Sequence, residues 1–538
     1  MRRLNHQRSL LLALTAALAG ALVAAAPAPA HPERPSAFPD ATGQFPAYRA
    51  RGPSRVVCKS DSRRLIGRSV RGSRKRLALR LLRRCRYRHI QAAVNAARSG
   101  DRILVLPGVY REEPSRALPE RDPRCFPSKT TQVVGRTPNE VKTTATYEYQ
   151  VACPNDEQLI AVLGDSLADP DRKCDVKCRI QIEGMGDSRD DVLIEGDRSK
   201  LQVIKGDRAD GLHLRNFTVQ YSDFNNVYVL ETDGFRFSDI VSRWSNEYGF
   251  LTFASDHGIY EDLEVYGHGD SGVYPGSGPE THGKRYGIHI RRVNSHHNLQ
   301  GDAGAAANGV WFYDNDFHHN QTGFVVDSFS PGHPGSPQDS AKWTNNRSYS
   351  NNENYWTAER LEYCSSKPDY EQRDPKIVCP KILVPVGVGL LIAGGNDNIV
   401  EGNRFWDNHR YGTMQIWVEA AFRGEQDLAL QNDTSHRNRY VNNLMGMAPD
   451  GSSAPNGTDF WWDEQGEGNC WQGNTTAPGR SITGDPASLA TCSSPRGFAP
   501  VNPVKHAFLV PCAAADENDR EAWFPPGCDW YEQPPKPR

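Results

Sequence analysis

The sequence lacks the features that mark membrane proteins, nucleotide-binding enzymes and strongly charged binders. Beyond the first 30 residues, the apolar run Val384–Ala393 has only ten residues, which is too short to span a bilayer and suits a buried strand. No glycine-rich loop follows a strand and opens a helix, which argues against nucleotide chemistry. The formal net charge of −2 neither favours nor excludes a polyanionic partner.

The first 30 residues have the pattern of a secretory signal peptide. Arg2, Arg3 and Arg8 form a basic start, residues 10–26 are apolar, and Ala28-Pro-Ala30 provides a small-residue cleavage site. We therefore expect the mature chain to be secreted, soluble and monomeric, without a transmembrane anchor. Because an exported chain does not meet nucleic acid, we expect no nucleic-acid partner.

Cysteine usage agrees with export, because all twelve cysteines follow the signal segment. An even number of cysteines in an exported chain indicates disulfides, and we pair neighbours in chain order so that each bridge closes a cap or loop. The Cys174-x3-Cys178 spacing would also suit zinc, but a second nearby ligand pair is missing. The twelve residues are Cys58, Cys85, Cys125, Cys153, Cys174, Cys178, Cys364, Cys379, Cys470, Cys492, Cys512 and Cys528.

One pattern recurs in five segments at a spacing of about 23 residues. Each segment has apolar residues at every second position, and each is followed by a polar turn and a second short strand. This period indicates one supersecondary unit stacked many times, and the alternation makes each unit a coil of strands. We predict an all-β fold, a right-handed parallel β-helix solenoid. The segments begin at Gly211, Gly234, His257, Gly287 and Gly309.

The start of the predicted coil has a recognisable cap. A short amphipathic helix over 87–98 precedes a tight turn, a buried strand from Ile103 and a glycine turn at Gly108. This arrangement resembles the N-terminal cap shared by pectin methylesterases, pectate-lyase-like proteins and many parallel β-helix repeat proteins. The resemblance covers residues 87–447, and it implies a helix that plugs the open end of the coil.

The catalytic motifs of these families are absent from the sequence. Gly267-His-Gly269 is similar to the signature of polygalacturonase-type hydrolases, but their Asn-Thr-Asp and Arg-Ile-Lys elements are missing. The Gln-Asp-Thr-Leu of pectin methylesterases, the Asp-Pro-His of alginate epimerases and the Arg-x-Pro-x-x-Arg of pectate lyases are missing too. No catalytic residue is therefore carried over from a family.

Other segments flank or interrupt the predicted coil. Residues 31–86 begin with a stretch rich in Pro and Ala, residues 31–50, which we expect to be disordered. The rest of the segment is basic, and it is a solvated helix or, alternatively, an attachment to an anionic wall polymer or polysaccharide. Residues 113–178 and 362–381 are predicted disulfide-bonded insertions. Residues 448–538, with their cysteines and tryptophans, are predicted to cap the far end of the coil.

The repeat turns predict a ladder of stacked asparagines where the coil bends. Within one residue, the ladder position holds Asp223, Asn246, Gly269, Asn298, Asn320 and Asn351. The preceding column holds Ser222, Ser245, His268, His297, His319 and Ser350. Histidines in that column either fill polar turns or serve a function.

Two outward columns on the first strands suit an extended sugar polymer, because aromatic rings stack on sugars and Arg pairs with uronates. A solvated sheet face is the alternative. From these columns and a polar insertion after Gly276 we predict substrate-binding roles for His213, Arg236, His289, Trp311, Tyr313, Lys284 and Arg285.

The densest polar region, residues 266–302, is the predicted reaction centre. In a lyase or C5-epimerase, a base removes the proton α to a uronate carboxylate while a cation neutralises that carboxylate. In a hydrolase, a carboxylate pair flanks the glycosidic bond. The predicted catalytic residues are His268, Asp270, Tyr274, Arg291, His297 and Asp302, and Ca²⁺ would bind Asp270, Glu280 and Asp302.

The functional hypothesis is an exported β-helix protein that acts on or binds polysaccharide, most plausibly an acidic uronate polymer, by lyase-type chemistry. The first alternative is a non-catalytic cell-surface or matrix rod that binds carbohydrate. The second is a glycoside hydrolase that uses a carboxylate pair.

Overall fold

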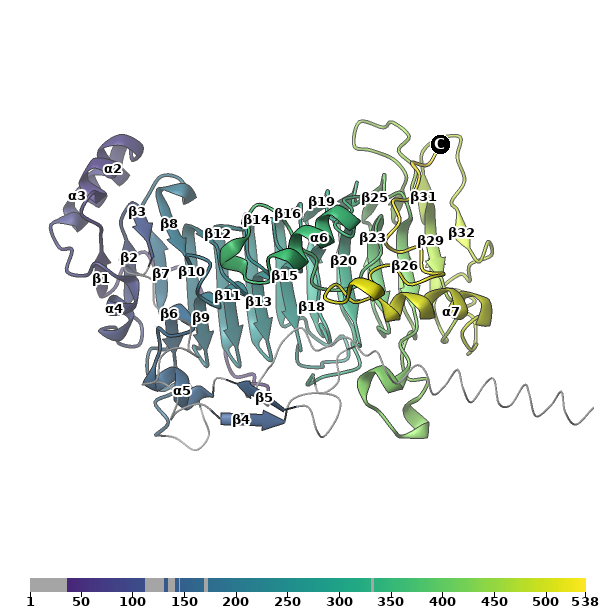
Figure 1. The fold of residues 1–538 in the computed structure, drawn as a ribbon, viewed down its shortest axis with the longest axis horizontal. Helices are drawn as coiled ribbons and strands as arrows, with labels where there is room; N and C mark the ends of the chain where they lie inside the picture. The colour runs from purple at the N-terminus through teal and green to yellow at the C-terminus, as the bar shows by residue number, and fades with distance from the viewer. Residues whose placement is uncertain (1–35, 112–129, 134–140, 145, 169–172, 330–332) are drawn as a thin grey trace, which may run out of the picture.

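The computed structural model describes residues 36–111, 130–133, 141–144, 146–168, 173–329 and 333–538. In these residues the chain winds as a right-handed parallel β-helix, with strands stacked side by side along one axis (Figure 1). The coil has a 19-stranded and an 11-stranded sheet, and a separate antiparallel hairpin lies beside it. The predicted all-β parallel solenoid is confirmed.

Strands of the two large sheets alternate along the chain, and each strand pairs with its equivalent in the next coil. The 19-stranded sheet contains β1 (Ser54–Val57), β2 (Arg102–Val105), β3 (Gly108–Tyr110), β7 (Gln181–Gly184), β8 (Val192–Glu195), β10 (Leu212–Gln220), β12 (Asp233–Arg243), β14 (Asp256–Tyr266), β16 (Ile288–His296), β18 (Val310–Tyr313), β19 (Asp316–His318), β21 (Lys342–Thr344), β22 (Arg347–Tyr349), β24 (Ile399–Glu401), β25 (Arg404–Trp406), β27 (Arg439–Val441), β28 (Leu444–Met445), β30 (Cys470–Gln472) and β31 (Thr475–Thr476).

The 11-stranded sheet contains β6 (Gln158–Leu163), β9 (Gln202–Asp207), β11 (Asn225–Leu230), β13 (Tyr248–Phe253), β15 (Ser271–Gly276), β17 (Gln300–Asp302), β20 (Thr322–Asp327), β23 (Val388–Ala393), β26 (Tyr411–Ile416), β29 (Thr458–Trp462) and β32 (Gly484–Asp485). The separate hairpin pairs β4 (Thr130–Val133) with β5 (Val141–Thr144).

The larger sheet is bent along its whole length, which gives the coil three outer faces. Strands β10, β12, β14 and β16 each bend at one residue with left-handed backbone geometry, and these residues are Asn216, Asp239, Asp262 and Arg292, with φ between 50° and 57°. On later coils the bend separates two short strands, such as β18 and β19. We call the outer side before the bend the first face, the outer side after it the second face, and the outer side of the 11-stranded sheet the third face.

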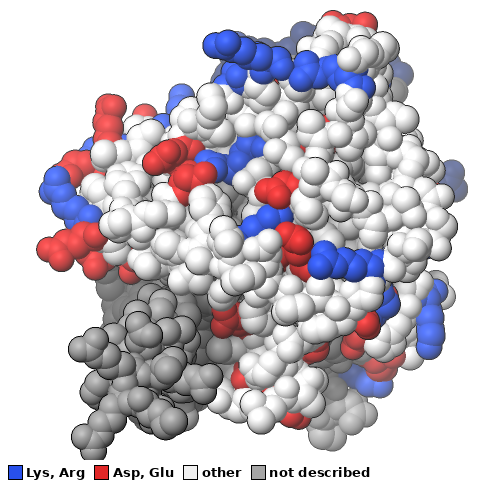
Figure 2. Space-filling model, turned by 90° about the vertical axis from the view of Figure 1, so that its right-hand side faces the viewer, with Lys and Arg blue, Asp and Glu red and all other residues white. Residues whose placement is uncertain are grey.

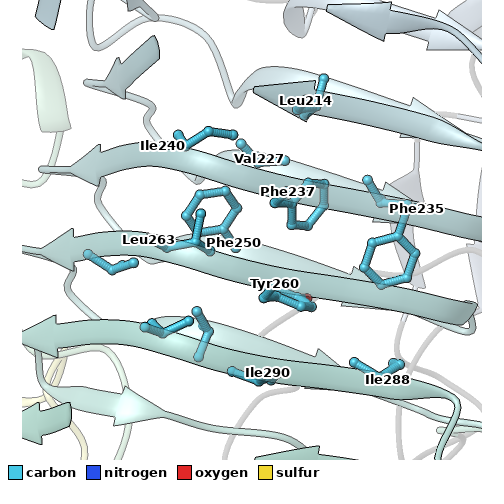
Figure 3. Close-up of a cluster of buried hydrophobic side chains, with 14 of the residues drawn as sticks. Leu214, Val227, Phe235, Phe237, Ile240, Phe250, Tyr260, Leu263, Ile288 and Ile290 are labelled. Carbon is cyan, nitrogen blue, oxygen red and sulfur yellow. The ribbon is translucent and has the colours of Figure 1, made fainter. Parts of the chain in front are cut away.

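Inward side chains form one continuous apolar core. Phe237 lies 5.0 Å from Tyr260 and 5.2 Å from Phe250 between ring centroids, and all three side chains are buried (Figure 3). Each buried aromatic or aliphatic side chain stabilises the fold by about 1.5–3 kcal/mol relative to an exposed one. Successive residues of a strand point alternately into this core and outward, so the position of a residue in its strand decides whether its side chain is in the core or on an outer face.

The N-terminal end of the coil is closed by α4 (Ile90–Asn95). Ile90, Ala93 and Val94 of this helix are buried in the same core cluster as Ile103 of β2. This confirms the predicted helical cap. The stacked strands extend further than the sequence indicated, from β1 before the cap to β32 near the far end.

The remaining helices lie outside the coil. They are α2 (Ser62–Ser69), α3 (Gly72–Leu82), α5 (Tyr147–Ala152), α6 (Ala358–Ser366) and α7 (Pro503–Leu509). The insertion that contains α6 and the C-terminal segment cover much of the third face: Trp356, Leu361, Trp523 and Trp530 share a buried cluster with Leu391 of β23. Figure 1 shows α6 and α7 in front of the 11-stranded sheet.

Five disulfides join neighbours in chain order, as the sequence predicted: Cys58–Cys85, Cys174–Cys178, Cys364–Cys379, Cys470–Cys492 and Cys512–Cys528. Cys153 is also disulfide-bonded, whereas Cys125 and the predicted signal segment lie outside the described residues. Such pairing is consistent with an oxidising, extracellular compartment. Among the helices of the described residues, none has the length and apolarity needed to cross a bilayer.

Candidate functional site

A row of stacked rings runs along the second face, with one ring on each of five successive coils. Strand register places the five residues side by side, and ring centroids of neighbours lie 5.2, 5.3, 4.8 and 4.2 Å apart. Interplanar angles of 6–16° make the stack nearly parallel. We call this set the ring row; its members are Tyr266, His296, His318, Tyr349 and Trp406.

A buried asparagine ladder, two residues further along each coil, fixes the spacing of the row. Asn298, Asn320, Asn351 and Asn408 each donate a side-chain hydrogen bond to the amide oxygen of the next member, with Asn456 last, at 3.1 Å. Stacked amides on adjacent parallel strands repeat about every 4.8 Å, so each coil is held at one register. The predicted ladder is confirmed from Asn298 onward.

Strand register removes the one-residue uncertainty of the predicted columns. His268 lies opposite Asn298, so Ser222, Ser245 and His268 belong to the ladder column itself. The predicted column that contained both His268 and His297 therefore divides into two. His268 belongs to the ladder, whereas His297 and His319 each precede a ladder asparagine by one residue and lie outside the ladder. Their rings stack at 5.7 Å, beside the ring row.

Four histidines consequently gather on the outside of two adjacent coils. Nδ1 of His296 lies 2.8 Å from Nδ1 of His297, and the same atoms of His318 and His319 lie 2.7 Å apart. Partial burial lowers the pKa of His296, His297 and His318, and the charges of neighbouring histidines lower the pKa of His318 further, to about 3. These three imidazoles are therefore neutral at neutral pH and able to accept a proton.

Polar partners flank the N-terminal end of the ring row. Arg243 of β12 donates to the Tyr266 hydroxyl at 3.3 Å, and Tyr266 stacks on His296. Nε2 of His296 lies 3.7 Å from a carboxylate oxygen of Glu264. A guanidinium, a phenol and a neutral imidazole thus follow one another on three successive coils of one surface.

The other end of the row opens into a hollow of about 460 Å³. Trp406 and Asp407 form one side, and Arg480, Lys536 and Arg538 bring three positive groups to its lining. A second hollow of about 260 Å³ shares Arg480 and Arg538 with it. Figure 2 looks onto this end of the molecule, where basic and acidic side chains are interspersed among largely uncharged surface.

Three of the predicted catalytic residues are buried away from this surface. His268 is inside the ladder, where Nδ1 lies 2.7 Å from the Ser245 hydroxyl. Asp302 points inward, and neither of its carboxylate oxygens has a hydrogen-bond partner among the described residues. Asp270 accepts hydrogen bonds from Tyr248 and Gln300 at 2.6 and 2.7 Å, and burial raises its pKa to about 7.

The other predicted catalytic residues lie on three different faces. Tyr274 is buried on the third face, where it packs 5.0 Å from Tyr248. Arg291 lies on the first face and forms an ion pair with Glu261 at 2.6 Å. Of the six, only His297 is part of the histidine group beside the ring row.

The predicted substrate-binding columns align on the first face as expected. His289, Trp311 and Tyr313 are in contact there, with Trp311 and Tyr313 centroids 4.5 Å apart. However, residues 43–49 lie across the N-terminal half of this face. Tyr48 covers His213, which is only 2% exposed.

The same N-terminal segment contacts other members of these columns. Phe45 packs on His289, and the Pro46 carbonyl accepts a hydrogen bond from Arg236 at 3.1 Å. Residues 36–50, which we expected to be disordered, are thus held by specific contacts. Arg285 pairs with Asp256, and Lys284 is exposed on the neighbouring insertion.

The three predicted calcium ligands do not share one site. Asp302 is inside the coil, Asp270 is under the cover of the third face, and Glu280 is on an exposed insertion. Burial of Asp302 raises the pKa of its carboxyl well above the usual value, which disfavours the charged form.

Most of the ring row was missed in the sequence reasoning, although the signal is present. Reading two residues back from each ladder asparagine gives His296, His318, Tyr349 and Trp406. The aromatic-x-Asn repeat appears only when coils of unequal length are aligned by their asparagines rather than by a fixed period.

No protein-family model matches the sequence, and no curated protein matches it. Several solved structures are similar in fold. A pectate lyase is 14% identical, with 81% of this chain and 79% of that chain covered and a TM-score of 0.36. An A-module of an Azotobacter vinelandii mannuronan C-5 epimerase is 13% identical, with 73% and 95% covered and a TM-score of 0.33.

The enzymatically active domain of a bacteriophage CBA120 tailspike protein is 8% identical, with 71% and 44% covered and a TM-score of 0.38. At such identities and scores the likeness is limited to the fold and assigns no activity. By its own strand pairing, the chain is a right-handed parallel β-helix.

Proposed function

We propose that the second face binds an extended acidic polysaccharide and cleaves it by β-elimination. The ring row carries this proposal, because it presents a partly exposed polar ring on each of four successive coils and ends at the largely buried Trp406. Coils repeat about every 4.8 Å, which is close to the advance per sugar in an extended glycan. Successive sugars would therefore meet successive imidazole and phenol groups.

The chemistry is assigned to Arg243, Tyr266 and His296. The Arg243 guanidinium pairs with the uronate carboxylate and stabilises the charge that develops on it. His296, neutral because its pKa is lowered, removes the proton α to that carboxylate. A carbon–carbon double bond forms as the glycosidic C–O bond breaks, and Tyr266 gives its hydroxyl proton to the departing oxygen.

The charge of the hollow at the other end of the row supports an acidic substrate over a neutral one. Arg480, Lys536 and Arg538 line it together with Asp407, which lies 3.6 Å from the Lys536 ammonium. A polymer that follows the row past Trp406 therefore meets more basic than acidic side chains. Opposite charges steer a polyanion and fix its direction on the surface. The net charge of −2 does not oppose this, because the basic groups are local.

The test is a glycan panel on residues 31–538, with and without Ca²⁺. Polyuronates and neutral glycans are followed by the ultraviolet absorbance of unsaturated products and by reducing ends. We expect unsaturated products from acidic polymers only, and a loss of about 10²-fold or more in His296→Ala and Tyr266→Phe. The matched control is His506→Ala. His506 lies in α7, away from the ring row, and its side chain pairs with Glu419.

Other outcomes separate the alternatives. Reducing ends without unsaturation would replace β-elimination by hydrolysis. Binding that weakens in Arg243→Gln without any turnover would make the chain a carbohydrate-binding rod. Absence of both binding and turnover across the acidic polymers would refute the proposal.

A further inference from the structure

A second cluster of functional groups lies at the insertion that follows β15, outside the ring row. Nδ1 of His282 is 3.2 Å from a carboxylate oxygen of Glu280 and 3.4 Å from Oδ2 of Asp339. The three atoms all lie within 4.8 Å of one another. Glu280 and His282 come from the exposed insertion, whereas Asp339 comes from the segment before β21.

Asp339 is held rigidly and is almost fully buried. Its side chain is 7% exposed, its backbone N–H donates to Asn308, and the Ser340 hydroxyl donates to Oδ1 at 2.8 Å. Oδ2 is also buried, yet it has no hydrogen-bond partner among the described residues, although His282 is nearby. A buried carboxylate oxygen without a hydrogen-bond partner is destabilising, so a bound cation would be stabilising here.

The separations between the three groups fit a shared metal ion better than a direct ion pair. Charge-assisted N–H···O bonds are about 2.7–2.9 Å long, which is shorter than both observed separations. In a tetrahedral Zn²⁺ site, with bonds of about 2.0–2.2 Å, ligand atoms lie about 3.4 Å apart. Both observed separations, 3.2 and 3.4 Å, are close to that edge length.

We propose that Glu280, His282 and Asp339 bind one Zn²⁺ ion, with water at the remaining position. One imidazole and two carboxylates are a donor set that Zn²⁺ accepts, whereas Ca²⁺ takes oxygen ligands. The two carboxylates balance the charge of the ion. Ser340 holds one oxygen of Asp339, so that the other oxygen faces the metal.

This ion would tie the insertion to the coil. Apart from the cluster, Gly278 at the start of the insertion bonds to Ala306 and Asn308 of the next coil, and Arg285 connects the end of the insertion to Asp256. Thr281 and Lys284, between these ends, bond only within the insertion among the hydrogen bonds of the described residues. A Zn²⁺ ion held by Asp339 would add a link from the tip of the insertion to a rung further along the axis. The site is separate from the ring row, so the zinc proposal does not depend on the polysaccharide proposal.

The test is titration of the EDTA-treated full chain with ZnCl₂ by calorimetry near neutral pH. We expect one tight Zn²⁺ per chain that is lost in Glu280→Gln and in Asp339→Asn. Ser340→Ala should weaken binding by about tenfold. Glu401→Gln, which removes an exposed carboxylate elsewhere, should bind like the unchanged chain.

Two further readouts make the assignment specific. Zn²⁺ should slow hydrogen exchange of residues 277–286 in the unchanged chain and not in Glu280→Gln, whose exposed position leaves folding intact. Loss of Zn²⁺ binding in His296→Ala but not in Glu280→Gln would place the ion at the ring row and overturn the proposal. Equal binding in Glu280→Gln, Asp339→Asn and the unchanged chain would overturn it as well, and so would absence of Zn²⁺ binding.

Discussion

His268 was predicted to be catalytic, but it occupies a position that asparagine holds on later coils of the ladder. Its Nδ1 faces the Ser245 hydroxyl, and its Nε2 lies 3.2 Å from the Ser242 carbonyl. Its backbone N–H donates to the side-chain oxygen of Asn298. Burial lowers its pKa to about 3, so the ring stays neutral in the folded chain. These contacts describe a structural bridge between coils.

His268→Asn should therefore be tolerated, whereas His268→Ala should not. Asparagine restores the amide that the ladder uses on later coils, so we expect a loss of less than about 1 kcal/mol in unfolding free energy. Alanine leaves the Ser245 and Ser242 groups without that partner and should cost about 1–3 kcal/mol. Urea denaturation measures both. Abolished turnover in a fully folded His268→Asn chain would instead support the predicted catalytic role.

The raised pKa of Asp270 should make the stability of the folded chain depend on pH. Burial raises the pKa of Asp270 to about 7 from the ordinary aspartate value of 3.8, so between these values the folded state binds a proton that the unfolded state has released. The stabilising contribution is complete below about pH 4 and is lost as the pH rises through 7.

Asp270→Asn mimics the protonated carboxyl and should remove that dependence. Between pH 5 and pH 8 we expect the variant to gain about 2–3 kcal/mol relative to the unchanged chain, measured by denaturation at both pH values. A constant difference across this range would show that Asp270 is already charged in the folded state.

At the scale of the element, the asparagine ladders and the bent strands set the position of the outer side chains. A second ladder runs through Asn315, Asn346, Asn403, Asn443 and Asn474 at the bend between the first and second faces. Because each amide bonds to the next coil, neighbouring strands cannot slip by one residue, which would turn every outward side chain inward.

Asn346→Ala tests this ladder. Asn346 is buried, donates to Asn403 and Phe312, and accepts from Asn315, so its removal should cost about 2–4 kcal/mol in unfolding free energy. The neighbouring Asn345 is exposed with φ of 61°, and Asn345→Gly keeps that backbone geometry. Equal losses in the two variants would contradict a special role for the ladder.

At the scale of the whole molecule, the ring row and the basic hollow form one track along the coil axis. Affinity for acidic oligosaccharides should rise with length until the chain covers the five rings, at about five sugar units. Calorimetry with oligomers of increasing length measures this. Affinity that is independent of length would place binding in the hollow alone.

Much of the fold was predictable from the sequence because its cause is local and repeated. Alternation around Gly211 and Gly234 identifies stacked strands, and the helix near Ile90 identifies the cap. Chain-order pairing of the cysteines was an expectation that the sequence could not prove, and the described disulfides agree with it. The candidate site was less predictable. Asp270 and His268 look reactive in sequence, but alternation alone does not say that an insertion covers the third face.

The sequence by itself determined the solenoid and its helical cap, because period and alternation act within one or two coils. Only the tertiary structure decided which residues are neighbours across coils of unequal length. Register brought His296, His318 and Tyr349 into one row and placed Glu280 beside Asp339. These contacts depend on how the coils stack and on which faces other segments cover. The sequence of a single repeat carries no information about either.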